Sequence, residues 1–131
     1  MSEQEVSDSL QRIDFWSRYV ALFFALIAYT ALLFSIKEGI LSAILAATTA
    51  IGLRIGIPYY AILTRYRQDD GSGPALPGNV HHGSLSISLL LAPLVALGAI
   101  LVQPNVNVAY AAGIATAVTS YFPLSYLLPR L

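Results

Sequence analysis

The 131-residue sequence contains no cysteine and little charge. Without cysteine the chain has no disulfide, thiolate metal site, iron–sulfur cluster or thiol nucleophile. Charged residues make up 11% of the chain and hydrophobic residues 56%, whereas soluble domains carry about 25% charged residues. This composition argues against an ordinary water-soluble domain. The formal net charge is 0, so there is no positive excess to neutralise phosphates, and nucleic acid is not an expected partner.

Apolar residues gather in four runs, at 19–36, 40–64, 85–102 and 106–128. Each run falls within the range of about 17 to 25 residues that a helix needs to cross a hydrocarbon core of ~30 Å. Together the runs hold 84 of the 131 residues but one of the 14 charged side chains, Arg54. The sequence therefore predicts a single all-α membrane domain, in which four transmembrane helices form two helical hairpins. A buried soluble four-helix core is disfavoured, because the short connections at 37–39 and 103–105 leave little polar surface to cover it.

The distribution of basic residues predicts the orientation in the cell membrane. With four spans, both termini and the middle connection lie on one side of the bilayer. Lys37 is the basic residue expected on the other side, against five on the first side: Arg12, Arg18, Arg65, Arg67 and Arg130. Because cytoplasmic segments are enriched in Lys and Arg, both termini are predicted to be cytoplasmic.

Two segments outside the runs carry further expectations. Residues 6–18, within the cytoplasmic segment 1–18, place Val6, Leu10, Ile13 and Trp16 at helical spacing, which predicts a short amphipathic helix at the membrane surface. A helix that docks a partner is the alternative. The segment 65–84 is rich in turn-forming residues and is predicted to be a cytoplasmic loop.

Both histidines of the chain, His81 and His82, lie near the end of this loop. Adjacent residues point apart on a helix or strand, and no third ligand is near in the sequence. We interpret them as solvated loop residues, so no metal or cofactor is predicted.

Arg54 is the candidate site residue, because an arginine within a span costs ~2.5–3.5 kcal/mol on insertion scales and usually faces protein or water. It lies about 21 Å from Ile40 along a helix, so its side chain can nearly reach the cytoplasmic headgroups. No carboxylate lies within any run, and the nearest in depth is Asp14, before the first run. Tyr121 is at a similar depth in the fourth run and is a candidate hydrogen-bond partner. Arg54 is then either an anchor between helices or a site for an anionic ligand.

Small residues recur at helical spacing in the second and fourth runs, which in membranes indicates close helix contact. The predicted packing positions are Ser42, Ala46, Ala50, Gly52, Gly56, Ala109, Gly113 and Ala117.

No catalytic motif is present: the sequence lacks G-x-S-x-G, H-E-x-x-H and a glycine-rich phosphate loop. We therefore expect a protein that is not an enzyme and that acts by helix association, as an accessory subunit of a membrane assembly or as a homo-oligomer. Two alternatives stay open. One is a small oligomeric transporter or channel for an anionic solute that uses Arg54, and the other is a viral or membrane-perturbing protein.

Overall fold

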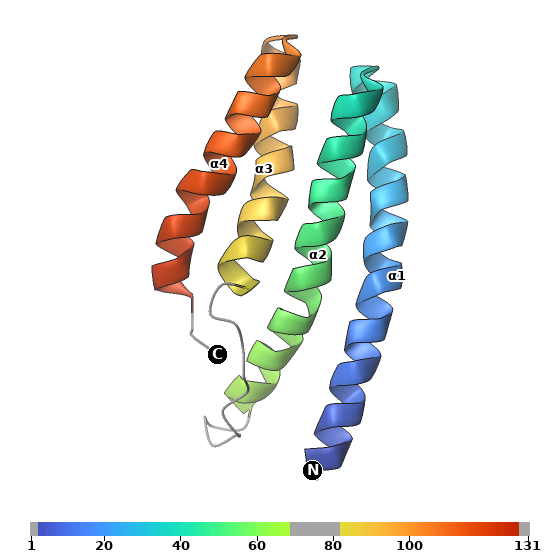
Figure 1. Cartoon of the computed structure of the whole chain (residues 1–131), viewed down its shortest axis with the longest axis vertical. Helices are drawn as coiled ribbons and strands as arrows, with labels where there is room; N and C mark the ends of the chain where they lie inside the picture. The colour runs from blue at the N-terminus through green and yellow to red at the C-terminus, as the bar shows by residue number, and fades with distance from the viewer. Residues whose placement is uncertain (1–2, 69–81, 129–131) are drawn as a thin grey trace.

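The computed structural model of the chain describes residues 3–68 and 82–128, and these form four α-helices and no strand. The helices are α1 (Glu3–Ile36), α2 (Gly39–Gln68), α3 (His82–Val102) and α4 (Val106–Leu127). They run up and down beside one another, with the two short turns at one end and the start of α1 and the end of α4 toward the other (Figure 1). The prediction of an all-helical chain is confirmed.

Three of the four helices are long and apolar enough to cross a membrane, over Ser7–Ile36, Gly39–Thr64 and His82–Val102. These three helices support the prediction of a membrane protein. The fourth predicted span corresponds to α4, which has 22 residues but is not among the candidate spans.

The helices pack in chain order, α1 on α2, α2 on α3 and α3 on α4. The apolar core lies toward the end with the turns, where residues of all four helices meet. Its members are Leu41, Leu45, Ala96, Ile100 and Ala109, flanked by Leu32, Ile36, Leu97, Val106 and Tyr110. Away from this core the buried residues include Ser17, Ala21, Ser84, Ser86 and Ser88, whose side chains are smaller or more polar.

Local hydrogen bonds mark the end of α1 at the first turn and the start of α4 at the second. Lys37 follows α1 in a left-handed conformation, with φ of 60°, and its N–H donates to the carbonyl of Leu33 at 3.0 Å. This contact supplies a hydrogen bond to the last turn of α1. Asn105 is the N-cap of α4, and its side chain accepts from the N–H of Asn107 at 3.0 Å.

The helix bounds differ from the predicted ones at the end opposite the turns. α1 is one uninterrupted helix of 34 residues, so residues 6–18 continue along the axis of the first span (Figure 1). Residues 6–18 therefore form no separate helix in the structure, and their placement at a membrane surface stays a prediction. Leu10 and Ile13 are half-buried while Trp16 is exposed, and the side chain of Val6 is outside the described set. Both ends of the predicted loop 65–84 are helical, because α2 runs to Gln68 and α3 begins at His82.

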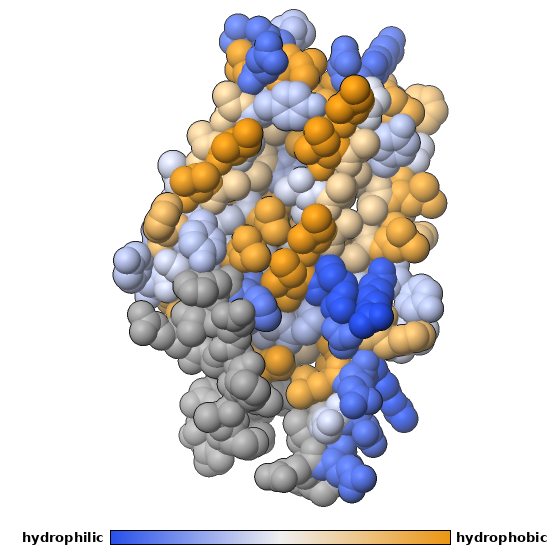
Figure 2. Space-filling model, viewed as in Figure 1, coloured by the Kyte–Doolittle hydropathy of each residue, from blue (hydrophilic) through white to orange (hydrophobic). Residues whose placement is uncertain are grey.

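Large apolar side chains cover much of the outer surface. On α1 alone they include Phe15, Trp16, Tyr19, Val20, Leu22, Phe23, Phe24, Leu26, Ile27, Leu33 and Phe34. Figure 2 shows hydrophobic residues across the middle of this face, with hydrophilic residues gathered at the turns and along the start of α1. Exposed apolar area on this scale indicates contact with lipid or with other protein.

Candidate functional site: an arginine shared between two helices

Arg54 lies on α2 at the face that packs against α1. Counting from the turn at 37–38, the antiparallel register places Arg54 level with Ala21 of α1. Ala21 is buried at 5% exposure, and its small side chain leaves room for the arginine to turn along the interface. The guanidinium meets residues one to two turns nearer the start of α1, which is about 6 to 10 Å along the axis.

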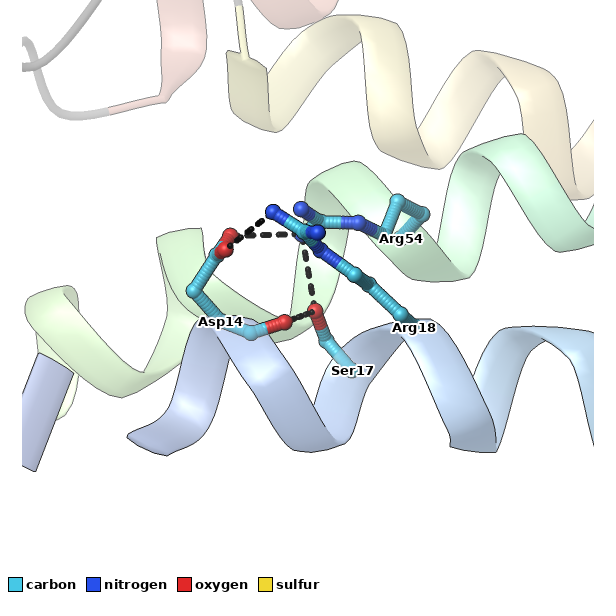
Figure 3. Close-up of polar contacts among 4 residues, drawn as sticks. All are labelled: Asp14, Ser17, Arg18 and Arg54. Carbon is cyan, nitrogen blue, oxygen red and sulfur yellow. Dashed lines mark hydrogen bonds and ion pairs between the residues drawn. The ribbon is translucent and has the colours of Figure 1, made fainter. Parts of the chain in front are cut away.

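The guanidinium of Arg54 binds two residues of α1 (Figure 3). Its Nη1 lies 2.7 Å from Oδ1 of Asp14 and donates to Oγ of Ser17 at 2.8 Å. Ser17 is fully buried and donates in turn to the backbone carbonyl of Asp14 at 2.7 Å. The serine hydroxyl is therefore used both as donor and as acceptor, which fixes its rotamer and orients the arginine.

A second arginine completes the cluster. Arg18 Nη2 lies 3.2 Å from Oδ2 of Asp14, one helical turn along α1. The side chain of Arg18 is 65% exposed and that of Asp14 43%, whereas that of Arg54 is 33% exposed. Each carboxylate oxygen thus receives one guanidinium, and the exposure rises from Arg54 outward to Arg18.

These contacts give the sole charged residue of the apolar runs a structural role. An arginine in a low-dielectric region is retained at low cost only when a counter-charge and hydrogen bonds compensate it. Asp14 supplies the charge and Ser17 an additional acceptor. The arrangement therefore ties α1 to α2.

Asp14 and Ser17 were not among the predicted site residues, although the sequence holds a signal for them. Ser17, Ala21, Ala25 and Ala28 recur at spacings of four and three, which is a stripe of small residues like those recognised in the second and fourth runs. Asp14 falls on the same face, one turn before Ser17. Ser17 and Ala21 are buried in the structure, and Ala25 and Ala28 are half-buried.

The predicted small residues of α2 lie on two faces. Ser42 and Ala46 are buried and Ala50 is half-buried, at four-residue steps that lead to Arg54 on the α1 side. Gly52 and Gly56 instead face α3. Ser86 of α3 donates to the carbonyl of Gly52 at 2.9 Å, and a Cβ at Gly56 would collide with the Ser86 hydroxyl.

The predicted small residues of α4 pack against α3 and line a groove. Ala109 is fully buried, and a Cβ at Gly113 would lie 3.3 Å from Cβ of Ala96 on α3. Together with Ala117 these residues border a cavity of about 130 Å³ between α2, α3 and α4. Ile44 and Ile114 also line it, and both are exposed at its rim.

The contacts described for the arginine cluster do not include the remaining candidates. Tyr121 belongs to α4, where its ring packs on Phe122 at a centroid distance of 5.8 Å, whereas the contacts described for Arg54 are with α1. His82 is exposed at the start of α3, and His81 is outside the described residues. Within residues 3–68 and 82–128 no three His, Asp or Glu side chains are grouped to hold a metal ion.

The four helices and the charged link between α1 and α2 define an all-helical protein with three membrane-spanning candidates. Comparison with protein-family models, with curated protein sequences and with solved structures found no match.

Proposed function

We propose that the chain is a four-span integral protein of the cell membrane that acts without catalysis, by helix association within a homo-oligomer or a larger membrane assembly. Both termini lie in the cytoplasm in this proposal, and the helices form two hairpins. The observation that carries it is the open groove between α2, α3 and α4, bordered by small residues of α4 and rimmed by exposed isoleucines. Small residues beside an apolar rim allow close approach of another helix.

Most of the small residues already pack against other helices of the same chain, so fewer surfaces remain for a partner. Gly52 packs against Leu90 and Ser86, and Gly56 packs against Ser86. Gly113 packs against Ala92 and Ala96. A partner therefore meets the groove rim and the outer apolar surface rather than the glycine face of α2.

The membrane topology can be tested with single cysteines, because the natural chain has none. We expect a membrane-impermeant maleimide added to intact cells to label Lys37→Cys and Gln103→Cys, and to label Ser7→Cys and Ser125→Cys after permeabilisation alone. Gln103 precedes α4 and Ser125 lies in its last turn, so the two positions report whether this helix crosses. Labelling of both from outside the intact cell contradicts a fourth span.

The association can be tested by weighing the particle in a mild detergent. We expect an oligomer, or a complex with a co-purifying membrane protein, and we expect Ile44→Ala with Ile114→Ala to weaken it more than tenfold. The truncated atoms each lose dispersion contacts of ~0.1–0.2 kcal/mol, which sum to about 1 kcal/mol for each side chain. A matched control is Ile51→Ala with Val118→Ala, since both residues are exposed and neither lines the groove.

A monomer with no partner in the unchanged protein contradicts the association. Equal weakening by the control pair contradicts the groove as its location.

The pairing of Arg54 with Asp14 favours this proposal over transport of an anionic solute. A charge compensated at 2.7 Å attracts an anion less strongly than an unpaired one. The two proposals differ in liposomes, where flux of an anion that is abolished by Arg54→Gln supports transport.

A further inference from the structure

The cluster of Asp14, Arg18 and Arg54 carries one more positive charge than negative. Each guanidinium has five N–H donors in a planar fork. Three contacts to Asp14 and Ser17 are described for the two arginines. The cluster therefore holds an uncompensated charge and further donors, and these are concentrated on Arg18, whose side chain is 65% exposed.

The cluster also lies at the depth where a phospholipid phosphate is expected. From Tyr19 to Ile36, α1 has no charged residue over 18 positions, which is about 27 Å of helix and close to a ~30 Å hydrocarbon core. Arg18 is the first charged residue beyond this stretch, and Asp14 lies one turn nearer the N-terminus. At the same level Phe15, Trp16 and Tyr19 are exposed on the outer surface of α1, and Trp and Tyr side chains are enriched at the membrane boundary.

The charges around the cluster do not cancel its excess. Arg12, two residues before Asp14, is exposed and positive. Toward the N-terminus of α1, the nearest described acid is Asp8, six residues before Asp14. Six residues correspond to about 9 Å along the helix axis. This separation is close to the Debye length of about 8 Å at physiological ionic strength.

From this charge, depth and donor supply we propose that Arg18 and Arg54, bridged by Asp14, form a binding site for the phosphate of an anionic phospholipid headgroup. Arg18 donates to the phosphate from its exposed edge, while Asp14 links it to Arg54, which is held in place by Ser17. Guanidinium groups suit phosphate because two parallel N–H donors match two phosphate oxygens. The site rests on the proposed membrane placement but not on helix association.

The single tryptophan of the chain makes the site measurable. Trp16 is within one turn of both Asp14 and Arg18, and it is 64% exposed. The purified protein is reconstituted in phosphatidylcholine vesicles that contain either brominated phosphatidylglycerol or brominated phosphatidylcholine at the same mole fraction. Bromine quenches the Trp16 fluorescence on contact, so the ratio of the two quenching curves gives the preference for the anionic lipid.

We expect a preference of about fivefold for phosphatidylglycerol, on the scale of one arginine at an anionic surface. Arg18→Gln is expected to remove most of this preference, and it leaves the contact of Arg54 with Asp14 in place. Arg12→Gln is the matched control, since Arg12 is an exposed arginine on the same helix that lies outside the cluster. It is expected to retain the preference, and far-UV circular dichroism checks that both variants keep the parent helicity.

The remaining outcomes separate the possible failures. Equal quenching by the two lipids overturns the site while leaving the membrane placement intact. Equal loss in Arg12→Gln and Arg18→Gln also overturns it, because it indicates diffuse attraction to the surface. Displacement of phosphatidylglycerol by millimolar inorganic phosphate, but not by chloride at the same ionic strength, overturns the lipid as the ligand. Absence of quenching by either lipid contradicts the membrane placement itself.

Discussion

Asp14→Leu is expected to lower the free energy of unfolding by about 2 kcal/mol, because it leaves Arg54 without its counter-charge. Breaking a fully buried ion pair by removing one partner costs ~3–5 kcal/mol, whereas exposed pairs contribute ~0–1 kcal/mol. Exposures of 33% for Arg54 and 43% for Asp14 place this pair between the two limits. Titration with sodium dodecyl sulfate in mixed micelles, followed by the fluorescence of Trp16, measures the change.

A double-mutant cycle of Asp14 and Arg54 is expected to show unequal losses of stability for the two single variants. Arg54→Leu is expected to cost less than 1 kcal/mol, because Asp14 keeps Arg18 as a partner and is accessible to solvent. The double variant is expected to recover most of the stability lost in Asp14→Leu, since replacing both charges by apolar groups is often neutral. Equal losses in the two single variants, or additive losses in the double one, contradict a protective role of Asp14 toward Arg54.

The sequence was sufficient to predict the helical class and most of the helix positions, because apolar runs and three-residue turns are local features. It also identified Arg54 as the residue to explain and Asp14 as the nearest carboxylate in depth. The contact between Arg54 and Asp14 depends on α1 continuing from residue 19 toward the N-terminus, as far as Glu3. The amphipathic pattern of residues 6–18 does not distinguish a helix lying on lipid from one extending the first span along α2.

The distribution of the small residues shows a second limit of sequence reasoning. Small-residue stripes predict that helices approach closely, but not which helices. In the structure Gly52 and Gly56 meet α3, while Arg54, two residues from each, meets α1. α2 therefore lies between α1 and α3. The contacts on its two faces show this, whereas the residues of α2 alone do not predict it.

Gly56→Leu is expected to separate α2 from α3 and to lower the free energy of unfolding by about 3 kcal/mol or more. Inserting side-chain volume into a packed interface costs ~1–3 kcal/mol and occasionally more. At Gly56 even a Cβ would collide with the Ser86 hydroxyl, and the Cβ of Ser86 would lie at 3.3 Å. Ser86 cannot turn away without losing its hydrogen bond to the carbonyl of Gly52. The sodium dodecyl sulfate titration again provides the measurement.

Gly98→Leu is the matched control, because no atom lies within 4 Å of a Cβ built at Gly98. Leucine is there expected to stabilise α3 slightly, since glycine in a helix interior costs ~0.5–1 kcal/mol relative to alanine.

A smaller substitution at Gly56 tests its contact with Ser86. Gly56→Ala alone is expected to cost about 1–2 kcal/mol, and combining it with Ser86→Ala is expected to cost less than the sum of the two single changes, because the collision is relieved. Strict additivity of Gly56→Ala and Ser86→Ala contradicts the close approach of α2 and α3 at this point.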